Sequence, residues 1–152
     1  MQARMTNPVF TLPGAMEALQ AAGKASRKAG LSEDLLNMVN LRASQINGCG
    51  VCVDLHARDL VKAGVSDERL WSIAAWREAP YYTDEERAAL ALTEAMTRIA
   101  DQPIGVPDDV WDEATRHFDE QRLAALVLAV ANVNTWNRLN VTTRQIAGAW
   151  TG

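Results

Sequence analysis

The chain has 152 residues, of which 48% are apolar and 22% are charged, and its formal net charge is −4. This length predicts one compact domain over residues 1–152, and no run of about 18 apolar residues suggests a membrane-spanning helix. The residues before Pro8 contain no apolar segment with a small-residue cleavage site, so we expect a cytoplasmic protein. The acidic balance and the scattered Lys and Arg residues argue against nucleic acid or a membrane as a partner.

Helical periodicity recurs along the chain while strand signals are nearly absent, which predicts an all-α fold of about seven helices. In the first half, apolar spacing and Pro, Gly and Ser signals predict helices over residues 13–30, 32–47, 49–64 and 66–79.

In the second half, residues 83–86 have the form of a capping box, which predicts a helix over residues 85–100. Pro107 at a first helical position predicts a short helix to about Phe118, and Asp119 begins a long apolar helix. Beyond Trp136, the polar residues 137–141 are expected to bend or end this helix, and Thr142 to cap a final short helix.

The two cysteines are the most informative residues. Cys49 and Cys52 lie three positions apart, and His56 follows four positions later. At about 100° per residue, the three side chains share one narrow stripe of a helix and can meet. The Asn47-Gly48 break places Cys49 at the first turn, where unpaired N–H groups and the helix dipole stabilise a thiolate.

This stripe suits thiol chemistry. A thiolate attacks a peroxide O–O bond and becomes a sulfenic acid, which a neighbouring thiol converts into a disulfide. We assign Cys52 as the attacking thiol, because His56 can take its proton, and Cys49 as the resolving thiol. Two other interpretations stay open: the three residues are ordinary packed side chains, or they bind zinc together with His117.

Residues 41–56 closely resemble the AhpD-like branch of the carboxymuconolactone decarboxylase family, whose signature is C-x-x-C-x-x-x-H. Residues 76–80, 83–95 and 134–140 match as well, so the resemblance covers nearly the whole chain. It implies an AhpD-like helical fold, an obligate homo-oligomer such as a trimer or hexamer, and weak organic-hydroperoxide reductase activity through Cys49, Cys52 and His56.

The resemblance also places a proton-relay glutamate twelve residues before the first cysteine, where this chain has Asn37. An amide cannot carry a proton at neutral pH, so the relay of the family is broken here. Asn37, Asn40 and Ser44 form a polar stripe that either faces a site or is a solvated helix face. Glu94 is a candidate for the missing carboxylate, or else a buried partner of an arginine.

Several residues outside the cysteine motif are expected to be structural. Asn134, Asn137 and Arg138 are interpreted as contacts of the last helix with its neighbours. The tryptophans are expected in the core or between subunits rather than as ligand platforms; they are Trp71, Trp76, Trp111, Trp136 and Trp150.

The leading hypothesis is an antioxidant enzyme that reduces alkyl hydroperoxides through a C-x-x-C dithiol and disulfide cycle. Its partners are then a hydroperoxide substrate and a dithiol reductant of lipoyl or thioredoxin type, and no metal or organic cofactor is required. Asn37 motivates a second hypothesis, a disulfide-exchange or redox-sensing protein on the same fold. The parent family also includes lactone decarboxylases, but that branch does not depend on a cysteine pair.

Overall fold

The computed structural model describes residues 1–101 and 103–149, and all regular secondary structure in these residues is helical. The all-α prediction is therefore confirmed, with eight α-helices in the described residues where the sequence suggested about seven. The helices are α1 (Pro8–Thr11), α2 (Ala15–Arg27), α3 (Glu33–Ile46), α4 (Gly50–Lys62), α5 (Asp67–Ser72), α6 (Asp84–Thr97), α7 (Asp108–His117) and α8 (Glu120–Thr143), with the 3-10 helices η1 (Ile73–Glu78) and η2 (Ile99–Asp101).

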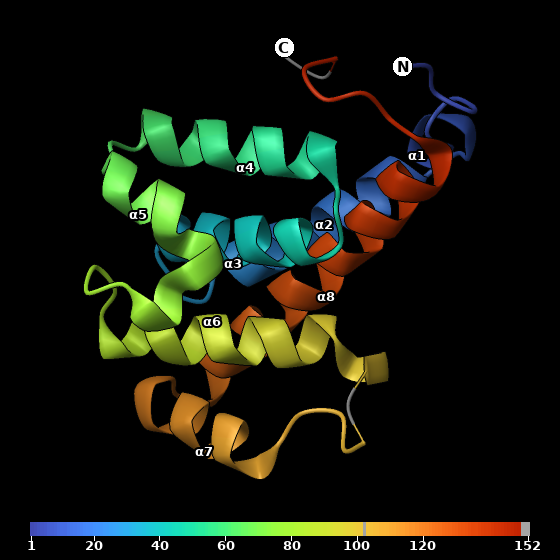
Figure 1. Ribbon diagram of the computed structural model, residues 1–152. Coiled ribbons are helices and arrows are strands. Elements are labelled where there is room, and N and C mark those ends of the chain that lie inside the picture. Colours follow the sequence, from blue (N-terminus) through green and yellow to red (C-terminus); the bar gives the residue numbers. More distant parts are fainter. Residues whose placement is uncertain (102, 150–152) are drawn as a thin grey trace.

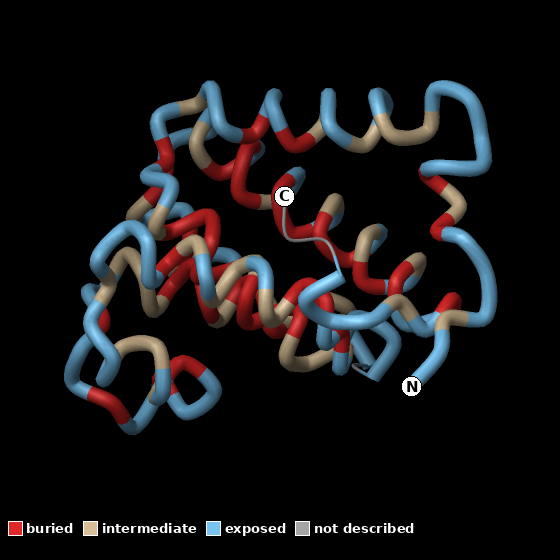
Figure 2. The backbone as a smooth tube through the Cα atoms, turned by 90° about the horizontal axis from the view of Figure 1, so that it is seen from above, coloured by how far each residue is buried: buried red, intermediate tan, exposed pale blue. Residues whose placement is uncertain are grey.

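Helix α3 lies at the centre of the packing, because it contacts α4, α6, α8 and η1. In Figure 1, α4 and α6 lie on opposite sides of α3, and the long α8 crosses the molecule diagonally. Helix α2 packs along α8, and α7 covers the far side of α6. Buried residues concentrate on α3, α6 and α8, whereas the outward turns of the surrounding helices are exposed (Figure 2).

The core is built mainly from aliphatic side chains on α3 and on the helices that cover it. Leu36, Met38 and Val39 of α3 are almost completely buried, as are Leu90 of α6 and Leu126 of α8. Burying a side chain of this size contributes about 1.5–3 kcal/mol relative to leaving it exposed. The cysteine-bearing α4 is held against this core through α3.

Three of the expected helix starts are confirmed by cap hydrogen bonds. The Ser32 hydroxyl accepts from the backbone N–H of Leu35 at 3.1 Å. Thr83 and Glu86 form the reciprocal capping box, and the Asp119 carboxylate accepts from the N–H of Arg122 at 2.8 Å. These side chains satisfy backbone donors that have no partner within the helix.

The C-terminal part of the sequence interpretation was wrong. Helix α8 neither bends nor ends over residues 137–141 but continues to Thr143. Thr142 therefore lies inside the helix and caps nothing, and residues 144–149 form turns rather than a short helix. The polar side chains of Asn137 and Asn140 are buried here, where they bond to other segments instead of to water.

The N-terminal arm also differs from expectation, because it contains the short helix α1 before Pro13. Asn7 caps α1 and Pro8 occupies its first position, a combination that fixes the start of a helix. The following helix begins at Ala15 rather than Pro13 and ends at Arg27 rather than Gly30.

The described tryptophans divide between the core and the surface. Trp76 is buried, whereas Trp71 is 76% exposed and Trp111 is 43% exposed in the single chain. Burial of the exposed ones between subunits stays a prediction. Trp150 lies outside the described residues.

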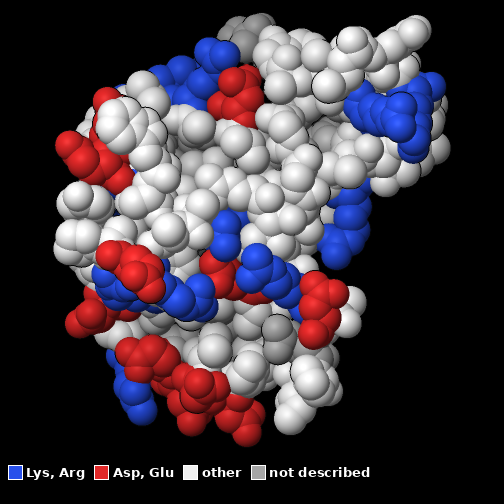
Figure 3. Space-filling view, in the orientation of Figure 1, with Lys and Arg blue, Asp and Glu red and all other residues white. Residues whose placement is uncertain are grey.

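No helix in the described part of the chain is long and apolar enough to cross a membrane. On the face shown in Figure 3, the Lys and Arg side chains lie in separate groups with Asp and Glu between them. This face carries no continuous basic stripe of the kind that follows a phosphate backbone.

Candidate functional site

The cysteine pair sits where α3 ends and α4 begins. Gly48, with a φ of 67°, breaks the chain direction after α3, and Cys49 is the N-cap of α4. The Cys49 Sγ accepts the backbone N–H of Cys52 at 3.4 Å. Cys49 and Cys52 form a disulfide whose Cα atoms are 5.4 Å apart, so the structure shows the oxidised pair at the helix N-terminus.

His56 lies one turn beyond Cys52 on α4, and its Nδ1 is 3.2 Å from the side-chain oxygen of Asn37. The amide oxygen only accepts, so Nδ1 carries the proton and Nε2 keeps its lone pair. Burial, together with the positive charge of Arg27, lowers the pKa of His56 from 6.5 to about 4. The imidazole is therefore neutral at neutral pH, and its unprotonated Nε2 is a weak base.

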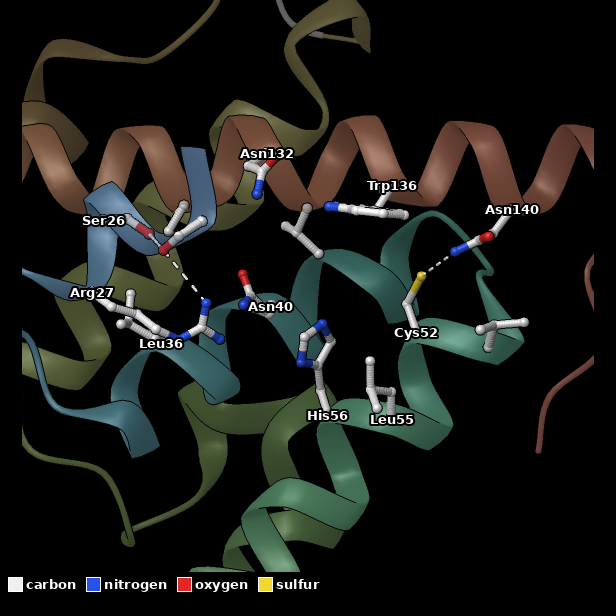
Figure 4. Close-up of a pocket in the computed structure, with 14 residues that line it drawn as sticks. Ser26, Arg27, Leu36, Asn40, Cys52, Leu55, His56, Asn132, Trp136 and Asn140 are labelled. Atoms are coloured by element: carbon white, nitrogen blue, oxygen red, sulfur yellow. Dashed lines mark hydrogen bonds between the residues drawn. The ribbon is translucent and has the colours of Figure 1, made fainter. Parts of the chain in front are cut away.

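A cavity of about 190 Å³ opens between α2, α3, α4 and α8, with Cys52 and His56 on its α4 wall (Figure 4). Leu36, Leu55 and Trp136 make much of the wall apolar, so the cavity can hold a small alkyl or aryl group. The lining residues are Gly23, Ser26, Arg27, Leu36, Asn40, Val51, Cys52, Leu55, His56, Ala129, Asn132, Val133, Trp136 and Asn140.

Asn40 gives this cavity an unused hydrogen-bond acceptor. Its Oδ1 is buried and has no partner among the described residues, and its side chain lies beside the cavity in Figure 4. A buried acceptor without a partner is unfavourable, so an O–H group of a bound molecule would be stabilised there.

A second cavity, of about 480 Å³, lies on the other side of the α4 N-terminus and is lined by Cys49 rather than Cys52. Arg144 and Gln145, which follow α8, form part of its wall together with Gly48 and Ala147. Val51 and Asn140 line both cavities. Each cysteine of the disulfide thus lines a different cavity.

Asn140 was missed as a site residue, because residues 137–141 were interpreted as a break in the helix. Its Nδ2 donates to the Cys52 Sγ at 3.2 Å (Figure 4). Asn132, Trp136 and Asn140 follow one another at intervals of four residues, so all three lie on the face of α8 that lines the first cavity. This spacing was the signal in the sequence that marked the face.

Asn37 and Asn40, two of the three residues in the polar stripe on α3, lie at the site. Ser44, the third, lies instead in the packing between α3 and α8. The Ser44 hydroxyl donates to the backbone oxygen of Asn40 at 2.7 Å and accepts from Asn137 at 3.0 Å. Asn137 also accepts from Asn47 at 2.8 Å, which ties α8 to the turn before Cys49.

Glu94 is held away from the cysteines by an ion-pair cluster. Its carboxylate accepts from Arg42 at 2.7 Å, from the Trp76 indole at 3.1 Å, and from Arg77. Burial opposes ionisation, but these donors outweigh it and hold the pKa of Glu94 below its usual value. The carboxylate is thus committed to Arg42 and Arg77, and it lines neither cavity next to a cysteine.

His117, the other residue of the zinc interpretation, lies on α7 with its Nε2 3.1 Å from Glu113. Across residues 1–101 and 103–149, no group of three or more His, Cys, Asp or Glu side chains is placed to hold a metal ion. His117 is therefore not brought to the cysteine pair in the manner that a four-ligand zinc site requires.

Comparison with known proteins agrees with the fold. The crystal structure of a protein of unknown function from Agrobacterium tumefaciens, proposed to be an AhpD antioxidant defence protein, superposes with a TM-score of 0.89 at 34% identity. The alignment covers 97% of this chain and 99% of that one. This similarity confirms the AhpD-like fold.

Sequence relatives cover the chain to different extents. The uncharacterized protein YdfG of Bacillus subtilis is 33% identical over 129 residues, which span 85% of this chain and 86% of YdfG. Alkyl hydroperoxide reductase AhpD of Coxiella burnetii is 46% identical, but over only 37 residues, or 24% of this chain and 21% of that protein. The profile of the carboxymuconolactone decarboxylase family matches residues 13–95. The chain therefore belongs to the carboxymuconolactone decarboxylase family.

Proposed function

We propose that the protein is a thiol-dependent oxidoreductase that reduces small organic hydroperoxides through the Cys49 and Cys52 pair. The observation that carries the proposal is the Cys49–Cys52 disulfide, whose Cys52 sulfur lines an apolar cavity that also holds a neutral His56. The partial similarity to AhpD of Coxiella burnetii supports the same class of activity.

The first half of the cycle takes place in the smaller cavity. In the reduced protein, the free Nε2 of His56 accepts the Cys52 proton, through water since no hydrogen bond joins the two side chains in the described structure. The Cys52 thiolate attacks the outer oxygen of the hydroperoxide, and the O–O bond breaks. The leaving alkoxide takes the proton from His56 and departs as an alcohol, leaving Cys52 as a sulfenic acid.

The cavity walls offer apolar contacts to the organic group of such a substrate and a hydrogen-bond acceptor to its O–H. Leu36, Leu55 and Trp136 contact its alkyl or aryl group, and the unpaired Oδ1 of Asn40 accepts the hydrogen bond of its O–H. This hydrogen bond would hold the peroxide end of the substrate inside the cavity that Cys52 also lines.

The second half of the cycle restores the dithiol. The Cys49 thiol attacks the sulfenic sulfur of Cys52, which releases water and forms the disulfide. A dithiol of lipoyl or thioredoxin type then attacks the Cys49 sulfur from the larger cavity and releases Cys52. The dithiol is oxidised to a disulfide, and both cysteines return to the reduced state.

The test is steady-state turnover of cumene hydroperoxide, coupled to a dihydrolipoamide or thioredoxin reductase system. We expect turnover by the wild type, none by Cys52→Ser, and an increased KM for Asn40→Leu. Trp71→Ser, an exposed position remote from both cavity linings, is the control that retains activity. Equal rates for the wild type and Cys52→Ser would refute the proposal.

The amide at position 37 supports a second candidate, a disulfide-exchange protein. Asn37 contacts His56 but cannot relay a proton from solvent, which slows each proton transfer at the ring. This candidate is favoured if the dithiol system reduces the pair and a partner disulfide reoxidises it, while cumene hydroperoxide is left unconsumed.

A further inference from the structure

Two buried asparagines form a hydrogen-bond chain that ends at the Cys52 sulfur. Asn140 on α8 donates from Nδ2 to the Cys52 Sγ at 3.2 Å, and its own Oδ1 accepts from Asn7 Nδ2 at 2.7 Å. Asn7 is 1% exposed, Asn140 4% and Cys52 3%. A donor that is shielded from water in this way interacts strongly with a charge on the atom that accepts its hydrogen bond.

The orientation of both amides is fixed by one backbone group. Asn7 caps α1, and its Oδ1 accepts the backbone N–H of Val9 at 3.1 Å. Because a backbone N–H only donates, the oxygen of Asn7 must face Val9, and its Nδ2 must face Asn140. Asn140 then has to present its oxygen to Asn7 and its N–H group to the sulfur.

The N-terminal arm is fastened to the end of α8 by two hydrogen bonds next to this pair. The backbone N–H of Arg4 donates to the oxygen of Thr143 at 2.9 Å, and Gln145 donates to the oxygen of Met5 at 2.9 Å. The arm thereby keeps Asn7 in register with Asn140 and fixes the direction in which the Asn140 amide donates.

We propose that Asn140, oriented by Asn7, makes Cys52 the sulfur that carries the negative charge of the reduced pair. Asn140 touches the reacting sulfur, whereas Asn7 is a positioning residue. This inference identifies which cysteine is the thiolate in the proposed cycle. Only the role of that thiolate in turnover rests on the proposed function.

The same donor acts when the disulfide is reduced. A thiolate of the external dithiol attacks the Cys49 Sγ, a new S–S bond forms, and the Cys49–Cys52 bond breaks. The electron pair of the broken bond moves to the Cys52 Sγ, where the Asn140 N–H stabilises it. Since the better-stabilised thiolate leaves faster, this donor directs the external thiol to Cys49.

A competing donor acts on the other sulfur, because the backbone N–H of Cys52 donates to the Cys49 Sγ at 3.4 Å. That contact is longer than the 3.2 Å contact from Asn140. The two donors make opposite predictions about which thiol ionises first, so both thiols have to be measured.

The first measurement is the alkylation of reduced protein by limiting iodoacetamide, with each cysteine quantified by mass spectrometry from pH 5 to 10. We expect Cys52 to be modified at lower pH than Cys49. In a Cys49→Ser background, Asn140→Leu should move the midpoint of Cys52 alkylation upward by about one pH unit. Thr135→Ala, a change at an exposed α8 position whose hydroxyl bonds to the Ala131 backbone oxygen, should leave it unchanged.

The second measurement tests whether Asn7 orients the Asn140 amide. Asn7→Ser keeps an N-cap for α1 but is too short to hold Asn140, and Asn7→Asp keeps the cap but accepts instead of donating. We expect both to raise the Cys52 midpoint, Asp more than Ser. A midpoint unmoved by Asn140→Leu, or moved by Asn7→Asp alone as a simple charge effect, would overturn the proposal. Alkylation uses no peroxide, so it does not depend on turnover.

Discussion

At His56, one hydrogen bond decides which ring nitrogen can act as a base. Asn37 occupies the position that the family resemblance assigns to a glutamate, and its oxygen lies 3.2 Å from Nδ1. The amide fixes the tautomer as a carboxylate would, but it contributes no negative charge to stabilise an imidazolium. Burial, and then the positive charge of Arg27, lower the pKa of His56 to about 4, so the ring stays neutral down to about that pH.

Asn37→Glu should therefore raise the pKa of His56, since a carboxylate beside Nδ1 favours the charged ring. NMR titration of the imidazole protons measures this directly, because the chain has only two histidines. Asn37→Gln, a neutral side chain of the same length as Glu, should produce no upward shift. If Glu and Gln give the same midpoint, position 37 does not control the charge of the ring.

Single residues were predictable from the sequence where the partners lie on the same helix. Cys49 and Cys52 are three residues apart at the start of α4, and helical spacing places His56 on the same cavity wall as Cys52. Asn7 and Asn140 lie at opposite ends of the chain, and neither periodicity nor composition indicates their contact. Only the folded arrangement of the arm on α8 shows it.

The element that organises the site is the first turn of α4, which separates two cavities. Cys52 lines the smaller cavity with His56, and Cys49 lines the larger one with Arg144. Under the proposed function, hydroperoxide and reductant would reach different cysteines from different sides of one helix. This arrangement would keep the dithiol carrier away from the cavity proposed for the peroxide.

A mixed disulfide should therefore accumulate on Cys49 and not on Cys52. In Cys52→Ser, a reductant thiol joined to Cys49 cannot be displaced by the second cysteine, so incubation with the disulfide form of the dithiol carrier should trap an adduct. Cys49→Ser should trap much less under the same conditions. Intact-mass measurement distinguishes the two variants, and preferential trapping in Cys49→Ser would show that the reductant enters from the other side.

Helix α8 shows why polar residues mislead a prediction of helix ends. Asn134, Asn137 and Asn140 would end a helix that faced water, because their side chains compete for backbone groups. In the structure, partners on other segments satisfy them, including Asn47 for the first two and Asn7 for the third. Tertiary contacts thus extend the helix to Thr143.

At the scale of the whole molecule, the all-helical fold followed from the sequence because caps and apolar spacing agree along most of the chain. The capping box at residues 83–86 is an example of such a local signal. The central place of α3 did not follow, since it depends on contacts with α4, α6 and α8. The two cavities were equally beyond sequence analysis, because residues from distant helices line them.

The buried His56 also makes the stability of the molecule depend on pH. Its pKa is about 4 in the folded protein and near 6.5 when unfolded, so the unfolded chain binds the proton first as the pH falls. The free energy of unfolding should be highest above about pH 6.5 and should decrease as the pH falls toward 4. At pH 5 the protonation of His56 in the unfolded chain should have lowered it by up to about 2 kcal/mol. Part of the ring faces the cavity, so solvent screening reduces this value.

Urea unfolding of the oxidised protein at pH 7.5 and pH 5 measures the difference. His56→Gln should remove most of the pH dependence in this window, whereas His117→Gln should retain it. A pH dependence that survives in His56→Gln would assign the effect to other groups.

The most direct test of the account is a single turnover without any reductant. Reduced protein is mixed with one equivalent of cumene hydroperoxide, and free thiols, cumyl alcohol and the Cys49–Cys52 disulfide are quantified over time. We predict that one equivalent of alcohol forms as two thiols are lost to this disulfide, and that Cys49→Ser instead accumulates a sulfenic acid on Cys52. Unconsumed peroxide and unchanged thiols in the wild type would contradict the account.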